Sequence, residues 1–400
     1  MNLILLTRST LAHLVGGVET HVDAVGRAAA ELGHAVEVIT TAHPRGLLRE
    51  EGAGVRTEYL ADTRPALAPG GWHRASVEAV RRRAARGQGD LVLSFSHAGA
   101  ALARARVGPP HWAVLYGRML AHLASEWHDR AGAAGLLAYA RRALSVVHHA
   151  LGEARLIARV DGVVATYDAL HTDLSRRAGR RVVLAYNGTD PRRFRPDAAA
   201  RAALRRRLDV PAAAPVLLMA ATVNRQKGIW IGVEAFVELA RRRPDVHLVV
   251  VGDGPDRARL AAGLAGRDAG RRARFVGAVP LAAMPGYFAA ADLLLYPTLR
   301  AEGLPTAVVE ALASGVPVVA SDRGGVASAV RDGETGLLLA APTVAGVAAA
   351  VTALLADPGR LAAMGHRGVE TARARFDTLR IVDRLLHELA RGVEACRAAD

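Results

Sequence analysis

The chain alternates short, continuously apolar runs with longer segments in which apolar residues recur every three or four positions. Asn2–Thr7 and Ala35–Thr41 are two such runs, and a helical segment that ends at Gly33 lies between them. Apolar runs of this length, stopped by glycine or proline, are typical of buried parallel strands. A strand, a glycine-containing loop, a helix and a second strand form the opening unit of a Rossmann-like sheet, in which ligands bind at the carboxyl ends of the strands.

The same alternation restarts in the second half of the chain. Asp90–His97 and Pro110–Tyr116 are predicted as further strands of the first series, which ends in the turn-rich segment Gly188–Pro191. A second series of apolar runs and helical segments follows that turn. Four hundred residues suffice for two domains that each bury a core. We therefore predict an α/β protein with one Rossmann-like domain over residues 1–186 and another over residues 187–374.

Composition narrows the class of protein. Of the residues, 51% are hydrophobic and 4% are aromatic, which describes a folded, alanine-rich chain rather than a disordered one. No apolar run reaches the roughly 18 residues that cross a bilayer. Met1–Arg8 lacks the basic leader and the longer apolar core of a signal peptide. The single cysteine, Cys396, excludes an internal disulfide framework and a cysteine-bound metal site. We predict a cytoplasmic protein.

The formal charge of +14 is carried almost entirely by arginine, because Lys227 is the one lysine among 52 basic residues. Such a skew suits a GC-rich genome, so surface arginines say little about function, although a positive field can attract anionic ligands. The densest cluster, Arg81, Arg82, Arg83 and Arg86, is interpreted as the solvated face or end of a helix. No aromatic residues are interleaved with it, so we predict no nucleic-acid partner.

The stretch Tyr296–Gly325 holds the clearest candidate site. A predicted strand that stops at Pro297 is followed by Gly303 and Pro305, then by a helix and another buried strand. Proline suits the first turn of a helix, where no amide partner is lost. Residues 303–306 should therefore place free backbone N–H groups and the positive end of a helix at the carboxyl edge of a sheet. This arrangement predicts an anion site suited to phosphate.

Two carboxylates, Glu302 and Glu310, bracket the start of that helix. Carboxylates repel a diphosphate, but they accept hydrogen bonds from the hydroxyl groups of a sugar or a ribose. On spacing alone, the favoured interpretation is that both are solvated surface acids on an amphipathic helix. Glu310, however, lies within the apolar helical segment Ala307–Ala313, where an unpaired acid is costly.

The stretch also resembles the donor-site signature of the family-4 retaining glycosyltransferases. These have the GT-B fold, in which two Rossmann-like domains with parallel sheets face a central cleft. The resemblance implies that Glu302 contacts the donor sugar, that the loop after it contacts the diphosphate and that Glu310 holds the ribose. The loop residues with this implied role are Gly303, Leu304, Pro305 and Thr306. In the family the terminal helix, here residues 375–400, completes the first domain.

Lys227 is the most informative single residue. It lies in the polar loop Asn224–Gly228, where a flexible ammonium can follow a phosphate oxygen from the ground state to the transition state. A solvated loop lysine is the alternative. Lys227 also resembles the family's phosphate-binding lysine. The family's arginine five residues earlier is Thr222 here, so half of the usual cationic clamp is missing, and Arg225 is the candidate substitute.

Further candidates follow other predicted strands. Gly16 and Gly17 allow a ligand to approach the backbone closely, and the resemblance implies that they face the donor diphosphate. Val276 and Gly277 are implied to frame the nucleotide base through backbone contacts. A glutamate that often follows the family's later glycine pair is Ser328 in this chain.

The acceptor side is less well defined. His97 and Tyr116 end two predicted strands of the first domain and are our acceptor-site candidates. The family commonly places an active-site histidine where Tyr116 aligns. Residues 118–158 are predicted to be helical and contain several histidines, but their spacing fits no site with an additional carboxylate. We predict no metal site and no cofactor.

These observations predict a retaining, metal-independent glycosyltransferase. It would move a sugar from a nucleotide-diphosphate sugar to a small-molecule acceptor, and uridine is the predicted base on family frequency alone. Lys227, the amides of residues 303–306 and the Gly16–Gly17 loop would stabilise the departing diphosphate. The family's usual explanation of retention is attack on the same face, with the leaving phosphate oxygen accepting the acceptor's proton, so no side-chain nucleophile is assigned.

The source of the protein, membrane association and alternative functions also bear on the prediction. The composition suits an actinobacterial pathway, including aminoglycoside-type natural products. Membrane association has no support, because no amphipathic helix with a basic face is apparent in the first domain. Three alternatives stay open: epimerisation or hydrolysis of a nucleotide sugar, a pyridoxal-phosphate phosphorylase of related fold, and a catalytically degenerate partner or activator protein. The departures at Thr222, Tyr116 and Ser328 favour the last of these.

Overall fold

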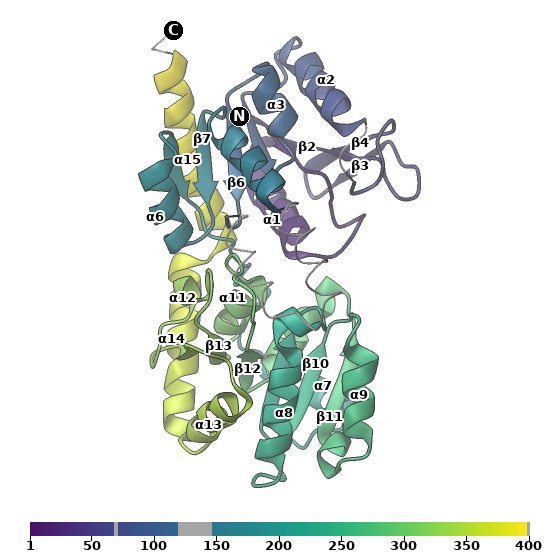
Figure 1. Cartoon of the computed structure of the whole chain (residues 1–400), viewed down its shortest axis with the longest axis vertical. Coiled ribbons are helices and arrows are strands. Elements are labelled where there is room, and N and C mark those ends of the chain that lie inside the picture. The colour runs from purple at the N-terminus through teal and green to yellow at the C-terminus, as the bar shows by residue number, and fades with distance from the viewer. Residues whose placement is uncertain (68–70, 119–145, 398–400) are drawn as a thin grey trace. The chain divides into compact units, whose positions relative to one another are not determined.

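The computed structural model describes residues 1–67, 71–118 and 146–397. The chain divides into two units, each built on a mostly or wholly parallel sheet (Figure 1). Unit 1 contains the described residues of Met1–Leu123, Ala140–Gly188 and Thr378–Asp400, and unit 2 contains Thr189–Asp377. The chain therefore passes from unit 1 to unit 2 within the turn-rich segment that the sequence marks as a linker.

The sheet of unit 1 has the strand order β3-β4-β2-β1-β5-β6-β7-β8. All neighbouring strands run parallel except β3 and β4, which form an antiparallel edge. The strands are β1 (Asn2–Leu6), β2 (Ala35–Thr41), β3 (Arg49–Gly52), β4 (Val55–Leu60), β5 (Leu91–Phe95), β6 (His111–Leu115), β7 (Gly162–Ala165) and β8 (Arg181–Leu184). The helices are α1 (Gly17–Glu31), α2 (Trp72–Ala84), α3 (Ala100–Ala105), α6 (Asp168–Arg177) and α15 (Thr378–Arg397), and residues 146–157 are also helical.

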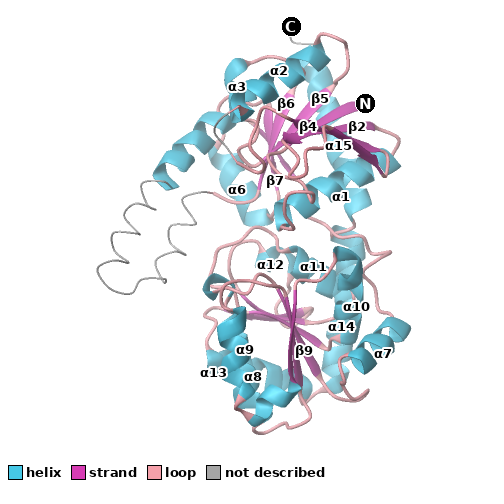
Figure 2. Ribbon diagram, turned by 90° about the vertical axis from the view of Figure 1, so that its right-hand side faces the viewer, coloured by secondary structure: helices cyan, strands magenta, loops and turns pink. Residues whose placement is uncertain are grey.

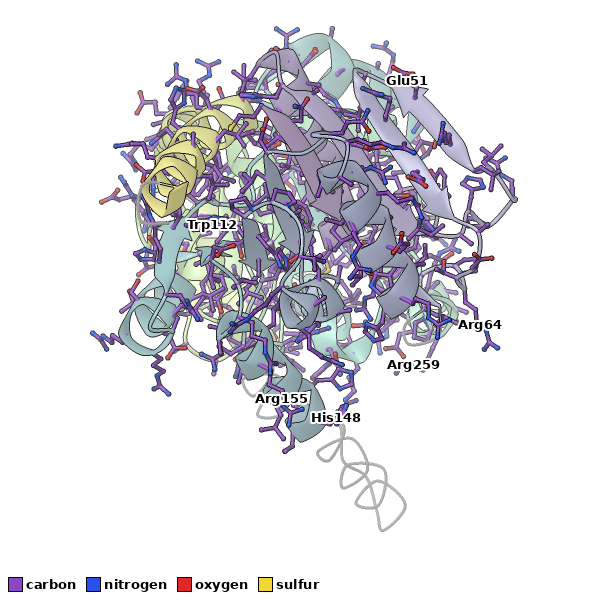
Figure 3. All side chains as sticks on the ribbon, turned by 90° about the horizontal axis from the view of Figure 1, so that it is seen from above. Glu51, Arg64, Trp112, His148, Arg155 and Arg259 are labelled. Carbon is purple, nitrogen blue, oxygen red and sulfur yellow. The ribbon has the colours of Figure 1, made fainter. Side chains whose placement is uncertain are left out.

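Successive side chains of β1 point to opposite faces of this sheet. Leu3 and Leu5 pack with residues of α1 and α15, whereas Ile4 and Leu6 pack with residues of α2 and α3. Because helices cover both faces, the strand is apolar at each of its four buried positions, 3–6, as expected for a buried parallel strand. Figure 3 shows Trp112 of β6 in the interior, with Arg155 at the periphery.

The sheet of unit 2 is parallel throughout and has the order β11-β10-β9-β12-β13-β14. The strands are β9 (Val216–Ala220), β10 (His247–Val251), β11 (Ala273–Gly277), β12 (Leu293–Tyr296), β13 (Val318–Ser321) and β14 (Gly336–Leu339). In Figure 2 the strands lie between α8 (Ile229–Ala240), α9 (Arg257–Ala265) and α13 (Val344–Leu355) on one side and α10 (Met284–Ala290) and α14 (Pro358–Arg375) on the other.

The remaining elements of unit 2 are short or lie at the ends of strands. They are α7 (Ala198–Arg207), α11 (Thr306–Ala313) and α12 (Val326–Ala329), with 3₁₀ turns η2 (Arg225–Lys227), η3 (Asp268–Arg272) and η4 (Leu281–Ala283). The predicted pair of Rossmann-like parallel sheets is confirmed. Within the described ranges, no single helix has the length and apolar composition to cross a membrane, although the sharply bent pair α13 and α14 has both when taken together.

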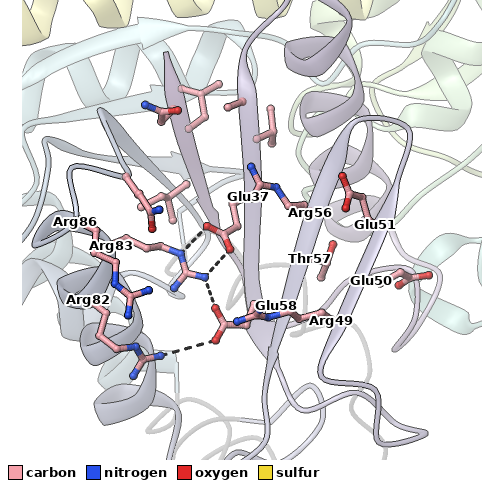
Figure 4. Close-up of a pocket in the computed structure, with 16 residues that line it drawn as sticks. Glu37, Arg49, Glu50, Glu51, Arg56, Thr57, Glu58, Arg82, Arg83 and Arg86 are labelled. Carbon is pink, nitrogen blue, oxygen red and sulfur yellow. Dashed lines mark hydrogen bonds and ion pairs between the residues drawn. The ribbon is translucent and has the colours of Figure 1, made fainter.

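The arginine cluster at the end of α2 corrects one expectation. Arg83 is only 8% exposed, and its guanidinium donates to both oxygens of Glu37, at 2.6 and 2.5 Å, and to Glu58. The Nη2 of Arg82 lies 3.8 Å from Glu58. These residues line a charged cavity of about 840 Å³ at the amino ends of β1 and β2 (Figure 4). The predicted solvated face was therefore wrong for Arg83, which neutralises two carboxylates.

Candidate functional site

Strand order brings three loops of unit 2 together. β12 pairs with β9 on one side and with β13 on the other, so the loops that follow these strands share the carboxyl edge of the sheet. The three loops cover residues 221–228, 297–305 and 322–325. The amide of Leu299 donates to the carbonyl of Gln226 at 2.9 Å, and the amide of Gly325 donates to the carbonyl of Glu302 at 2.8 Å. The central loop is thus tied to both of its neighbours.

Two glycines make this close approach possible. Gly228 has a φ of +66°, and a Cβ there would lie 1.9 Å from the carbonyl oxygen of Pro297. Gly324 has a φ of +60°, and its Cβ would lie 2.0 Å from the carbonyl oxygen of Glu302. Only glycine combines this backbone conformation with such a short separation. The glycine pair at 324–325 therefore fixes the position of the Glu302 loop.

The tied loops hold a cluster of four side chains. The ammonium of Lys227 lies 2.5 Å from Oε2 of Glu302 and 3.4 Å from the hydroxyl of Tyr296. That hydroxyl donates to the same Oε2 at 2.8 Å, and Thr298 donates to Oε1 at 3.1 Å. Burial, together with the negative charge of Glu302, raises the pKa of Tyr296 well above its usual value, which keeps the phenol protonated.

Counting hydrogen-bonding capacity shows what this cluster can still bind. A carboxylate offers about four acceptor positions, and Glu302 uses three of them for Lys227, Tyr296 and Thr298. An ammonium has three N–H donors, and Lys227 directs two of them at Glu302 and Tyr296. One acceptor position on Glu302 and one donor on Lys227 are left for a ligand that carries both a hydroxyl and an anionic oxygen.

The start of α11 lies directly after this cluster. The helix begins at Thr306 with Pro305 as its N-cap, one residue later than predicted. Of the four predicted amide positions, Pro305 carries no N–H and Leu304 is buried. The backbone N–H groups of Gly303, Thr306 and Ala307 donate to no acceptor in the described part of the chain. Two of the four predicted amides, with that of Ala307, are therefore unpaired at the positive end of the helix, and their role toward an anion stays a prediction.

Glu310 lies one turn further along α11 and is largely buried. Its carboxylate forms no hydrogen bond or ion pair with any residue that the structure describes. Burial raises the pKa of Glu310 to about 7, against a smaller opposing effect of Arg193. An acid in this state is poised to accept hydroxyl hydrogen bonds, because such bonds stabilise its charged form.

The predicted base-binding residues lie at the end of β11. Gly277 adopts a φ of +77° and its carbonyl accepts from the amide of Gly252 at 2.8 Å, while Val276 is partly exposed. The guanidinium of Arg257 packs against Gly277, and its buried Nε has no partner among the described residues. Nothing in the sequence singled out Arg257, since its position depends on α9 packing beside β11.

The predicted substitute for the missing arginine does not join the lysine cluster. Arg225 is exposed, and its guanidinium lies 5.7 Å from the ring centre of Trp230, in a cation–π arrangement. Thr222 is also exposed. The role of Arg225 toward a phosphate stays a prediction.

In unit 1, the Gly16–Gly17 pair begins α1. Gly16 is the N-cap, and a Cβ there would lie 2.5 Å from Oε2 of Glu19. The other oxygen of Glu19 accepts from the hydroxyl of Ser9. Gly16 is thus required locally to make room for the Glu19 carboxylate, and the implied role of both glycines toward a diphosphate stays a prediction.

Tyr116 has a partner within unit 1. Its hydroxyl lies 2.7 Å from Nδ1 of His21. Burial lowers the pKa of His21 to about 4 and raises the pKa of Tyr116 well above its usual value, so both side chains are neutral. No motif in the sequence pointed to His21, and an acceptor role for Tyr116 stays a prediction.

His97 follows β5, and its buried Nε2 lacks a partner among the described residues. Burial, and to a lesser degree the charge of Arg8, lower the pKa of His97 to about 4. His122, Trp127 and His128 of the predicted histidine-rich helix lie outside the described residues. In the part of the chain that is described, no three His, Cys, Asp or Glu side chains gather around one point as metal ligands.

Two family models match the chain. The model described as "Glycosyltransferase Family 4" matches residues 15–193, and the model described as "Glycosyl transferases group 1" matches residues 200–371. Between them they span most of both units. Among solved structures, sucrose-phosphate synthase from Thermosynechococcus elongatus is similar with a TM-score of 0.80 and 24% identity, over 99% of this chain and 100% of that one. This likeness supports the GT-B fold.

Curated relatives are more similar in sequence but over shorter spans. The GDP-mannose-dependent α-(1-6)-phosphatidylinositol monomannoside mannosyltransferase of Mycolicibacterium smegmatis is 37% identical over 45% of this chain and 49% of its own length. D-inositol 3-phosphate glycosyltransferase 2 of Catenulispora acidiphila is 32% identical over 62% and 60%. The 2-deoxystreptamine glucosyltransferase of Streptomyces kanamyceticus is 33% identical over 54% and 57%. The matches span about half of the length of these relatives.

Proposed function

The chain belongs to the family-4 glycosyltransferases of GT-B fold, and we propose that it transfers a sugar from a nucleotide-diphosphate sugar to a hydroxyl group of an acceptor, with retention of configuration. One observation carries this proposal. The Lys227–Glu302 pair lies beside unpaired amides at the start of α11, and the unpaired carboxylate of Glu310 lies one turn further on. A cation, helix amides and a hydroxyl acceptor are the groups that a nucleotide-diphosphate sugar requires.

Each group has a proposed part in the reaction. Breaking the glycosidic bond to the diphosphate leaves negative charge on the departing oxygen, which the free N–H of Lys227 and the amides of Gly303 and Thr306 stabilise. The remaining acceptor position of Glu302 takes a hydroxyl of the donor sugar, and Glu310 takes the ribose hydroxyls. The departing oxygen then accepts the proton of the attacking hydroxyl, so no side-chain nucleophile is needed. We propose that these groups act without a metal ion.

The relatives supply candidates for the two substrates. Their names include GDP-mannose as donor and phosphatidylinositol monomannoside, inositol 3-phosphate and 2-deoxystreptamine as acceptors. Uridine stays our prediction for the base, with guanosine as the alternative that the first of these relatives favours. The intact Lys227–Glu302 geometry argues against a degenerate partner protein, because a chain without catalysis has no need of a paired lysine in this loop.

A thermal-shift panel tests the donor half of this proposal. UDP-, GDP-, ADP- and dTDP-sugars are added to the wild type, to Glu310→Ala and to a control, Glu334→Ala, which removes an exposed acid of the same unit. A ligand at a hundred times its Kd stabilises the folded protein by about 2.7 kcal/mol. We expect one nucleotide to raise Tm in the wild type and in the control but not in Glu310→Ala. The absence of a shift with every nucleotide sugar would refute the proposal.

A further inference from the structure

Arg8 is a half-buried cation without a partner in the described part of the chain. It lies two residues beyond β1, and its own carbonyl is fixed by the hydroxyl of Thr41 at 2.6 Å. Its guanidinium makes no hydrogen bond or ion pair to any described residue. Glu19 attracts it but lies beyond ion-pair distance and accepts from Ser9 instead. Because a guanidinium stays protonated in proteins, its burial leaves a desolvated charge that an anionic ligand would stabilise.

Topology places other basic side chains beside Arg8. β5 pairs with β1, so His97, two residues past the end of β5, lies at the same edge of the sheet. The indole of Trp72 at the start of α2 donates to the carbonyl of Ala98 at 3.2 Å, which brings α2 to the same place. His73 follows Trp72 in α2. Its pKa is lowered by burial and by the positive charges of Arg104 and Arg8. We refer to Arg8, His73, His97 and Arg104 as the basic cluster.

The basic cluster has the chemistry of a phosphate site. Arg8 and Arg104 are permanent cations, and Arg104 also has no partner in the described chain. The other ring nitrogen of His97 bonds to the backbone of His149, and its buried Nε2 has no partner among the described residues. A bound phosphate would favour the protonated ring, in which Nε2 also carries a hydrogen and donates. A phosphate group offers several acceptor oxygens, and arginine binds it through two parallel N–H···O bonds. Glu19 is the carboxylate that acts on Arg8, and it lies beyond ion-pair distance and accepts from Ser9, so it offsets the charge of Arg8 only in part.

We propose that the acceptor of this glycosyltransferase carries a phosphomonoester or phosphodiester, which Arg8 and His97 bind at the carboxyl edge of the unit 1 sheet. This inference rests on the proposed function, whose acceptor it specifies. It disfavours the aminoglycoside-type acceptor that the composition suggested, because an aminocyclitol is positively charged and would be repelled by Arg8 and Arg104.

The phosphate can belong to a soluble sugar phosphate or to a lipid headgroup. The neighbouring loops after β1, β2 and β4 are a reason to test both. Five of their large apolar side chains are exposed, namely Leu14, Val15, Leu47, Leu48 and Leu67. Single exposed apolar residues are ordinary, but several on adjacent loops indicate a contact surface.

Calorimetric titration of the full chain tests the inference without requiring turnover. The probes are inositol phosphate, unphosphorylated inositol, 2-deoxystreptamine, and vesicles of phosphatidylcholine with or without phosphatidylinositol. The variants are Arg8→Gln and Arg104→Gln, with Arg86→Gln as the control at the opposite edge of the sheet. Lys227→Ala is included because the start of α11 also attracts anions. Circular dichroism melts verify that each variant folds.

We expect inositol phosphate or the phosphatidylinositol vesicles to bind the wild type, Arg86→Gln and Lys227→Ala alike. Arg8→Gln and Arg104→Gln should each weaken this binding at least tenfold, whereas unphosphorylated inositol and 2-deoxystreptamine should bind poorly to all of them. Binding to inositol phosphate alone identifies a soluble acceptor, and binding to the vesicles alone identifies a lipid. Equal affinity in Arg8→Gln and the wild type, or no preference for the phosphorylated probe, would overturn the inference. The nucleotide-sugar panel on the same preparations reports separately whether the proposed function holds.

Discussion

The protonation of Glu310 should make the binding of a nucleotide sugar depend on pH. The free protein holds this carboxyl at a pKa of about 7 because burial disfavours its charge. Ribose hydroxyls donate to a carboxylate but gain less from a protonated acid, so binding should select the ionised form. At pH 8 about nine tenths of the free protein is ionised, and at pH 6 about one tenth is. Affinity should therefore fall about tenfold from pH 8 to pH 6, or about 1.4 kcal/mol.

The choice of ligand decides whether this effect can be seen. A nucleotide with a terminal phosphate titrates near pH ~6 itself, whereas the diphosphate of a nucleotide sugar is a diester without that proton. Calorimetry with the nucleotide sugar at pH 6, 7 and 8 is therefore the assay, and two buffers of different ionisation enthalpy count the released protons. Glu310→Gln is the matched control, because glutamine keeps the shape and a carbonyl acceptor but does not titrate. Its affinity should be the same at all three pH values and lower than that of the wild type at pH 8.

The same shift predicts a change in stability with a defined sign. A carboxyl whose pKa rises on folding stabilises the folded state fully below its unfolded value of 4.5, and this contribution is lost as pH rises through about 7. The difference amounts to about 3 kcal/mol. Glu310→Gln should therefore become more stable relative to the wild type between pH 5 and pH 8, as measured by urea unfolding. A wild-type affinity that is constant from pH 6 to pH 8, or an equal slope in Glu310→Gln, would refute the reasoning.

Two further predictions concern other charged side chains. Lys227→Ala should lower kcat by ~100- to 1,000-fold with a smaller change in donor affinity, because the ammonium stabilises charge that develops as the diphosphate departs. A steady-state kcat/KM close to the wild-type value would contradict this role. Arg83→Met should cost about 2–3 kcal/mol in urea unfolding, since it leaves Glu37 and Glu58 without their shared cation. Arg82→Met is the control, because it removes a more exposed and more distant partner of Glu58, and it should cost less than about 1 kcal/mol. Equal losses of unfolding free energy in the two variants would show that the ion pairs of Arg83 contribute no more to stability than that of Arg82.

The two-unit architecture was predictable because its signal is local. A buried parallel strand such as β1 is apolar at each of its buried positions, and polar or turn-forming residues follow it, so the alternation of strands and helices is visible in the sequence. The start of α11 was predictable for the same reason, since Pro305 and the apolar segment after it specify a helix within a few residues. The edge strand β3, which is exposed at all four positions, lacked such a pattern, so the sequence predicted only that residues 42–90 contain short strands and not where they lie.

The contacts that define the candidate site depend on strand order, which the sequence does not display. Lys227 and Glu302 meet because β9 and β12 are neighbours in the sheet, although eight other elements separate the two strands along the chain. The resemblance assigned a role to each residue but gave no indication that they pair. Glycine at 324 is explained only when its approach to the Glu302 carbonyl is known.

Composition does not show which arginines of this chain are structural and which are open to a ligand. The number of arginines in this chain suits the codon preference of a GC-rich genome, which led us to treat surface arginines other than Arg225 as weak evidence for function. Buried arginines differ from exposed ones, because burying a guanidinium is unfavourable unless a negative charge lies nearby. Arg83 finds that charge in Glu37 and Glu58 and is structural. Arg8 is also partly withdrawn from solvent, but no carboxylate among the described residues lies within ion-pair distance of it, so its surroundings leave a position for an anionic ligand.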